Sequence, residues 1–206
     1  GANAPATYVK PTQVVNLDGG VSAIAAGSGR TCAAVGDGGV LCWGSASYGC
    51  ELGDGMVSNS GVPRPTEVPI PDAGVVSVAL GSEHSCALTG AGQVWCWGVQ
   101  KWKWETGGCC GGEPTPTAYY ASPTLITGLP ADVRSIHATD VGTCALTDAG
   151  TVLCWGLNTG ERYLAPGTVG TVTTIPATPT NLPSTGIGEL RFGNGHVCAL
   201  VDGGPR

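Results

Sequence analysis

Six of the ten cysteines in this 206-residue sequence form three pairs with one fixed spacing. Two cysteines ten residues apart flank a Gly-containing stretch at Cys32 and Cys42, Cys86 and Cys96, and Cys144 and Cys154. Directly opposite residues of a β-hairpin lie about 4.5 to 5.5 Å apart at Cα, within reach of a disulfide. Structural zinc sites favour cysteines two to four residues apart, and only the vicinal Cys109 and Cys110 approach that spacing. The spacing favours cross-strand disulfides over a metal site or buried free thiols, so no metal is expected.

The cysteine pairs and the overall charge bound the compartment and the partners. Disulfides persist in oxidising surroundings, so we expect an extracellular, periplasmic or cell-surface protein. The chain carries 15 acidic and 9 basic residues, a net charge of −6, which disfavours binding to a phosphate backbone. Nucleic acid is therefore not an expected partner. No apolar run approaches the roughly 20 residues that cross a bilayer, so no membrane span is expected.

The paired cysteines belong to a motif that repeats along the chain. Its complete copies read TCAAVGDGGVLCWG at 31–44, SCALTGAGQVWCWG at 85–98 and TCALTDAGTVLCWG at 143–156. A fourth copy begins as VCALVDGG at 197–204 and stops before its second cysteine. Gly and Asp tolerate the positive φ of tight turns, so each copy predicts a β-hairpin.

Two further features recur with the hairpins. Segments rich in β-branched residues precede them and predict half-buried strands at 21–27, 75–81, 133–139 and 187–193. A Pro-Thr marker recurs at 10–12, 64–66, 122–124 and 178–180. No window shows the apolar period of a helix. The sequence predicts an all-β protein with complete repeats at 21–75, 76–133 and 134–186, the tail of a preceding repeat at 1–20 and a truncated repeat at 187–206.

The order of these features resembles the regulator of chromosome condensation repeat. Along the chain, the Pro-Thr marker comes first, then a V-x-x-V-A-x-G strand, then H-S-C-A-L and G-x-V-x-C-W-G. In the first copy YGCELGDG follows at 48–55. The cysteine-containing form of secreted bacterial proteins is the most similar. The resemblance implies a β-propeller, usually of seven blades with four antiparallel strands each. Three repeats cannot close such a ring, so further sequence or another chain is expected to supply the missing blades.

The resemblance also bears on function. The chromosomal member of the family is a nucleotide-exchange factor for a small nuclear GTPase, a role that does not fit an acidic, disulfide-bearing chain. Other members are non-catalytic binders, including a bacterial group that inhibits β-lactamases with a propeller face. We therefore expect a non-catalytic binding or assembly module with a protein or glycan partner and no cofactor. The alternatives are a structural spacer of a surface fibre or multi-domain surface protein, and a secreted enzyme with a central-channel site.

Binding residues are expected where the repeats differ. The connection that follows the second hairpin is the longest and the most aromatic, and its candidate residues are Lys101, Trp102, Lys103, Trp104, Tyr119 and Tyr120. Exposed Trp and Tyr with nearby charge are typical of interface hot spots, and stacking on sugars is equally compatible. The alternative is that the tryptophans pack against the next blade.

The polar residues do not predict a catalytic site. His84 and His196 occupy one repeat position, which Arg30 and Gly142 occupy in the other copies, and this equivalence favours a structural role. His137 has no neighbouring acid or nucleophile that would make a recognisable triad. A calcium site at residues 51–54 would have too few acidic ligands.

Four cysteines lie outside the hairpin pairs: Cys50, Cys109, Cys110 and Cys198. A bridge between the vicinal pair would join Cα atoms about 3.8 Å apart, below the usual range. Cys50 and the vicinal pair lie in equivalent connections of neighbouring repeats, so we predict a disulfide from Cys50 to Cys109 or Cys110. Cys198 would pair with the remaining one, with another chain or with nothing.

Overall fold

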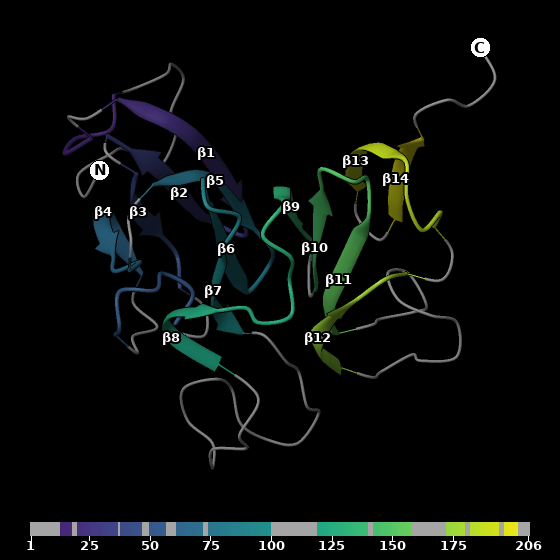
Figure 1. Cartoon of the computed structure of the whole chain (residues 1–206). Helices are drawn as coiled ribbons and strands as arrows, with labels where there is room; N and C mark the ends of the chain where they lie inside the picture. Colours follow the sequence, from purple (N-terminus) through teal and green to yellow (C-terminus); the bar gives the residue numbers. More distant parts are fainter. Residues whose placement is uncertain are drawn as a thin grey trace.

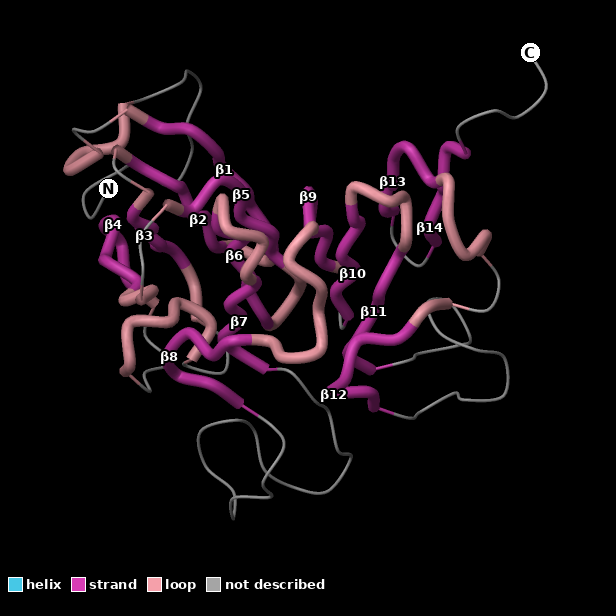
Figure 2. The backbone as a smooth tube through the Cα atoms, viewed as in Figure 1, coloured by secondary structure: helices cyan, strands magenta, loops and turns pink. Residues whose placement is uncertain are grey.

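A computed structural model describes residues 13–17, 20–36, 38–46, 50–56, 61–71, 74–99, 119–139, 142–157, 172–179, 182–193 and 196–201 of the chain. All regular elements in these ranges are β-strands, drawn in magenta in Figure 2. The strands form three four-stranded antiparallel sheets and a two-stranded one. Across these same ranges, no helix has the length and apolar character needed to cross a membrane.

Each sheet is built from strands that follow one another in the chain. The first sheet contains β1 (Val21–Gly27), β2 (Arg30–Val35), β3 (Gly39–Gly44) and β4 (Val62–Val68). The second contains β5 (Val75–Leu80), β6 (His84–Thr89), β7 (Val94–Val99) and β8 (Tyr119–Leu125). The third contains β9 (Val133–Ala138), β10 (Gly142–Thr147), β11 (Val152–Leu157) and β12 (Val172–Ala177). The fourth contains β13 (Ile187–Gly193) and β14 (His196–Val201).

These bounds confirm the strands expected before each hairpin. The predicted segments at 21–27 and 187–193 coincide with β1 and β13, and those at 75–81 and 133–139 each run one residue beyond β5 and β9. The second and third strands of the first three sheets form the predicted hairpins. The repeat boundaries at 75, 133 and 186 stay predictions.

The sheets follow one another in chain order, with the first and the fourth at opposite ends of the row (Figure 1). The first strands of successive sheets contact one another, β1 with β5, β5 with β9, and β9 with β13. Apolar side chains fill each junction between sheets. Val78, Ile136 and Leu190 hold one equivalent position and are each buried in a cluster with side chains of the preceding sheet.

One edge of every sheet is irregular in the same way. Each first strand skips one residue in its pairing with the second strand, which is a β-bulge. The skipped residues are Ser22, Val76, Arg134 and Gly188. A bulge bends the strand and increases its twist, which discourages pairing with another chain.

The opposite edge explains the Pro-Thr marker. In β4 the marker threonine, Thr66, lies opposite Cys42, and Pro65 lies in the irregular part of the pairing just before it. In β8, Thr124 lies opposite Cys96, and Pro123 takes the equivalent place. Proline has no N–H to offer an approaching strand, so it is confined to edge strands or bulges. In the first two sheets the marker therefore lies in the outer strand and protects that edge.

The marker predicted for the third repeat lies three residues beyond the position that the structure gives it. The predicted marker at 178–180 begins after β12 ends at Ala177. The residue opposite Cys154 is Ala177, so Pro176 and Ala177 take the structural places of the marker. The sequence TPT at 178–180 fits the marker pattern, but the strand pairing puts Pro176 at the marker position.

Candidate functional site

The structure brings each predicted hairpin pair of cysteines together. Cys32 lies directly opposite Cys42, Cys86 opposite Cys96, and Cys144 opposite Cys154. The paired Cα atoms are 4.2, 4.1 and 4.1 Å apart, and each pair is joined by a disulfide in the structure. All six side chains are buried between sheets. Each disulfide thus fastens the two central strands of its sheet at their midpoint.

The aromatic connection of the second sheet begins and ends at a defined base. Val99, the last residue of β7, pairs with Tyr119, the first residue of β8, and Gly98 pairs with Tyr120. Tyr120 is 38% exposed. The candidates at positions 101 to 104 lie outside the described residues, as does the side chain of Tyr119. The structure therefore fixes where the two ends of this connection lie, and its binding residues stay a prediction.

Arg30 extends from the first sheet into the second. Its side chain is buried, with the residue only 2% exposed. The guanidinium donates hydrogen bonds to the carbonyl oxygens of Gly81 at 2.8 Å, Ser82 at 2.7 Å and His84 at 2.7 Å. Its Nε also donates to Ser85 Oγ at 3.3 Å. One side chain from β2 thereby holds the whole turn between β5 and β6.

Charge around Arg30 compensates for its burial. Burial lowers the pKa of Arg30 from its ordinary value, and the nearby Glu51 and Glu83 carboxylates act in the opposite direction. Glu51 is itself 1% exposed. A buried charge is tolerated when hydrogen bonds and opposite charges compensate for its burial. Arg30 has hydrogen bonds to the second sheet and the charge of two nearby carboxylates.

His84 makes the equivalent contact one sheet further along. It occupies the repeat position of Arg30, and its Nε2 lies 2.8 Å from Thr143 Oγ1 of the third sheet. Thr143 in turn occupies the position of Ser85, which Arg30 contacts. Burial, and secondarily the charge of Arg30, lower the pKa of His84 to about 3. The imidazole is therefore neutral near pH 7 and joins two sheets, which supports the structural role expected of this position.

The segment after β3 packs into the same junction. Cys50 and Glu51 are buried there, and the Glu51 carbonyl oxygen accepts hydrogen bonds from Trp97 Nε1 at 3.0 Å and Ser85 Oγ at 3.2 Å. Gly53 has a φ of +75°, and a Cβ at this position would lie 2.5 Å from the Trp97 ring. Only glycine fits both requirements. Residues 50–53 thus form a buried wedge between the first two sheets.

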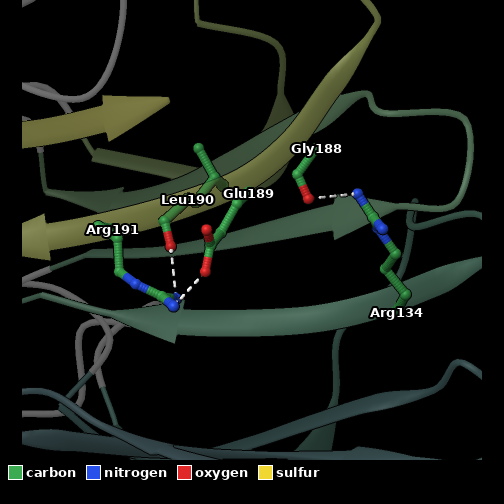
Figure 3. Close-up of polar contacts among 5 residues, drawn as sticks. All are labelled: Arg134, Gly188, Glu189, Leu190 and Arg191. Carbon is green, nitrogen blue, oxygen red and sulfur yellow. Dashed lines mark hydrogen bonds and ion pairs between the residues drawn. The ribbon is translucent and has the colours of Figure 1, made fainter. Parts of the chain in front are cut away.

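The junction between the third and fourth sheets uses different contacts (Figure 3). Gly142 has no side chain to reach the next sheet. Arg134 instead donates to the carbonyl oxygens of Gly188 at 2.8 Å and Ile187 at 3.1 Å. His137 stacks on Phe192 with ring centroids 5.2 Å apart. Contacts from β9 therefore hold the fourth sheet to the third, in place of a side chain at the repeat position of Arg30 and His84.

The remaining candidate residues are the cysteines outside the hairpins and the acidic residues at positions 51 and 54. Cys50 is buried, and its predicted partners Cys109 and Cys110 lie outside the described residues, so that disulfide stays a prediction. Cys198 is exposed. Glu51 Oε2 accepts the N–H of Cys50, while Asp54 Oδ1 accepts the N–H of Met56. In the ranges that the structure describes, no three His, Cys, Asp or Glu side chains gather as a metal site.

Four-stranded antiparallel sheets that follow one another with their first strands in contact are the blades of a β-propeller. The sequence agrees with this architecture, because residues 21–50 and 75–99 match the model of the regulator of chromosome condensation (RCC1) repeat. The chain therefore contains RCC1-like repeats, and its fold is that of the RCC1-type propellers.

Relatives and solved structures extend the comparison. An RCC1 domain-containing mitochondrial protein of Arabidopsis thaliana, RUG3, is 34% identical over 45% of this chain and 20% of its own length. Protein pim1 of Schizosaccharomyces pombe is 27% identical over 88% of this chain and 35% of its own length. Yeast RCC1 (Prp20), solved bound to Kap60, superposes with a TM-score of 0.61 at 22% identity, covering 78% of this chain and 37% of that chain. The chain thus spans about a fifth to a third of these curated relatives.

Proposed function

We propose that the chain is a non-catalytic binding module that presents the connection between β7 and β8 to a protein or glycan partner. The observation that carries the proposal is the base of that connection, where Val99 pairs with Tyr119 and leaves the ring of Tyr120 partly exposed. A paired base on a disulfide-fastened sheet is a rigid platform for a variable segment. Binding residues are commonly placed in this way, on loops held by a rigid scaffold.

The sequence of residues 99–120 and the relatives support a binding role. Lys and Trp alternate at positions 101 to 104, and rigid aromatic side chains with nearby charge are what hot spots use. Among the structural relatives, yeast RCC1 was solved bound to another protein, Kap60. We extend protein binding to this chain and include glycans, because aromatic rings also stack on sugars.

The setting that we propose is an oxidising compartment, extracellular, periplasmic or at the cell surface. Three buried hairpin disulfides support it, because such bridges are rare where thiols are kept reduced. The cysteine-containing repeat of secreted bacterial proteins would fit this setting.

The module is further proposed to belong to a larger ring, usually of seven blades. Ile24 holds the position of Val78 and Ile136, which are 7% and 4% exposed against the preceding sheet, yet Ile24 is 64% exposed. An apolar side chain at a junction position supports a further blade against β1, from additional sequence or another chain. The repeat boundaries of the sequence analysis would then divide the chain into blades.

A binding assay with loop variants tests the proposed function. The oxidised chain is applied to a glycan array and cross-linked to the secreted proteins of its source, and the Kd of each hit is measured. We expect Trp102→Ala with Trp104→Ala to weaken binding about 30-fold, the effect of losing about 2 kcal/mol at a hot spot. Tyr163→Ala, in the corresponding connection after β11, is the matched control and should leave the Kd unchanged. If the double substitution leaves the Kd for a partner unchanged, the binding site lies elsewhere.

A further inference from the structure

The strand β14 has nearly the sequence of two strands that are completely buried. β6 reads HSCALT, β10 reads GTCALT and β14 reads HVCALV. Leu88 and Leu146 are 1% and 2% exposed, whereas the equivalent Leu200 is 63% exposed. The residue type is that of a core position, and the exposure is that of a surface. Each of β6 and β10 has a flanking strand that has no counterpart beside β14 among the described strands.

The missing neighbour is a third strand. β6 pairs with both β5 and β7, and β10 pairs with both β9 and β11, but the only described strand that pairs with β14 is β13. The outer strands of the complete sheets are protected by proline, and β14 contains none. The edge of β14 away from β13 is apolar, has no partner strand among the described residues and lacks such protection, so it is a template for another strand.

The register of β14 fixes what would lie opposite Cys198. Arg191 pairs with Cys198, as Ala79 pairs with Cys86 and His137 with Cys144. The two central strands of each complete sheet place a cysteine directly opposite this position. Cys198 is exposed.

The same register defines a second position of the incoming strand. Leu88 lies opposite Val94 and Leu146 opposite Val152, and both valines are buried. A valine two residues before the cysteine would accordingly lie opposite Leu200 and cover it. The complementary sequence is V-x-C, as in the third strands of this chain.

We propose that the free edge of β14 binds an antiparallel β-strand of the G-x-V-x-C-W-G type and that its cysteine forms a disulfide with Cys198. The contact continues the sheet pairing already present in the complete blades, with main-chain hydrogen bonds for affinity and the V-x-C positions for selectivity. Disulfide formation from two thiols releases two protons and transfers two electrons to an acceptor such as a small-molecule disulfide, which is reduced to two thiols.

A covalent capture experiment tests the edge. The probe is a peptide with the sequence of residues 150–157, GTVLCWGL, extended by two lysines and supplied as a mixed disulfide with glutathione. The Cys198 thiolate attacks the peptide sulfur and releases glutathione as its thiolate, so no further oxidant is needed. We expect capture at Cys198 at least tenfold faster than capture of a scrambled peptide of the same composition. Non-reducing peptide mapping locates the bond and verifies the three hairpin disulfides.

Variants separate strand recognition from simple thiol reactivity. Leu200→Asp should reduce the capture rate to that of the scrambled peptide, and the side chain is exposed enough for the fold to tolerate the change. Cys198→Ser should abolish capture but still bind the reduced peptide, measured by fluorescence anisotropy. Equal rates for the two peptides, or a native disulfide from Cys198 to Cys109 or Cys110, would overturn the proposal.

Discussion

Replacing Arg30 with Met tests whether the polar contacts between the first two sheets stabilise the fold. Methionine keeps most of the buried stem of the side chain and removes the guanidinium. The Gly81 and Ser82 carbonyl oxygens then lose the donation from Arg30. The His84 carbonyl oxygen still accepts the Gly81 N–H at 2.9 Å. The substitution also removes the positive charge near Glu51.

The expected loss of stability is about 3 to 5 kcal/mol. This value comes from the two lost hydrogen bonds to the Gly81 and Ser82 carbonyl oxygens, because a hydrogen bond to a charged group contributes about 1.5 to 3 kcal/mol. Removing one partner of a buried charge pair costs a similar amount, about 3 to 5 kcal/mol. Arg30→Lys retains the charge but not the fork of donors, so it should lie between Met and the wild type.

Urea unfolding of the oxidised protein, followed by tryptophan fluorescence, measures these differences. Arg134→Met is the matched control, because Arg134 also donates to two carbonyl oxygens of the next sheet but is exposed. It should cost less than about 1 kcal/mol, as surface substitutions generally do. Equal losses for the Arg30 and Arg134 variants would refute the reasoning that burial makes the Arg30 contacts valuable.

Three further predictions concern the same junctions. Because the pKa of His84 is lowered to about 3 in the folded state, the unfolded state binds more protons between about pH 3 and 6.5, and stability falls as the pH falls through that window. His84→Gln should therefore lose less stability than the wild type between pH 7 and pH 4 in thermal melts, and parallel curves would contradict this. Gly53→Ala should cost at least about 2 kcal/mol in urea unfolding, because of positive φ and the clash with indole, whereas Gly36→Ala, with nothing within 4 Å of the added Cβ, should cost about 1 kcal/mol. Alkylation of the unreduced, denatured protein should leave Cys50 unlabelled if it is bridged to the vicinal cysteine pair, and labelled Cys50 would exclude that disulfide.

The fold could be predicted from the sequence because the same local pattern occurs in three complete copies. Hairpin turns, cysteine spacing and β-branched segments each recur, so errors in a single copy are corrected by the others. The outer strand was the exception. It carries proline and pairs irregularly, and in the third repeat a second Pro-Thr stretch after Pro176 matched the pattern better than the strand itself.

The junction contacts could be predicted in kind but not in detail. The equivalence of Arg30 and His84 indicated a structural position, and both side chains do join sheets. Their partners are more than 50 residues away in sequence, and no local pattern relates a side chain to the next repeat's backbone. For Glu51 the sequence shows only an acidic neighbour of Asp54, because its burial results from the wedge that packs against Trp97.

The bulged and proline-bearing edges have a consequence for how such a chain evolves. A duplicated blade has a β-bulge at one edge and proline at the other, so it adds no edge strand that readily pairs with another chain. Its hairpin disulfide closes within its own ten-residue interval and needs no partner in a neighbouring copy. Blade number can therefore change by duplication or deletion with little risk of aggregation or mispaired cysteines, while the connections between blades diversify independently.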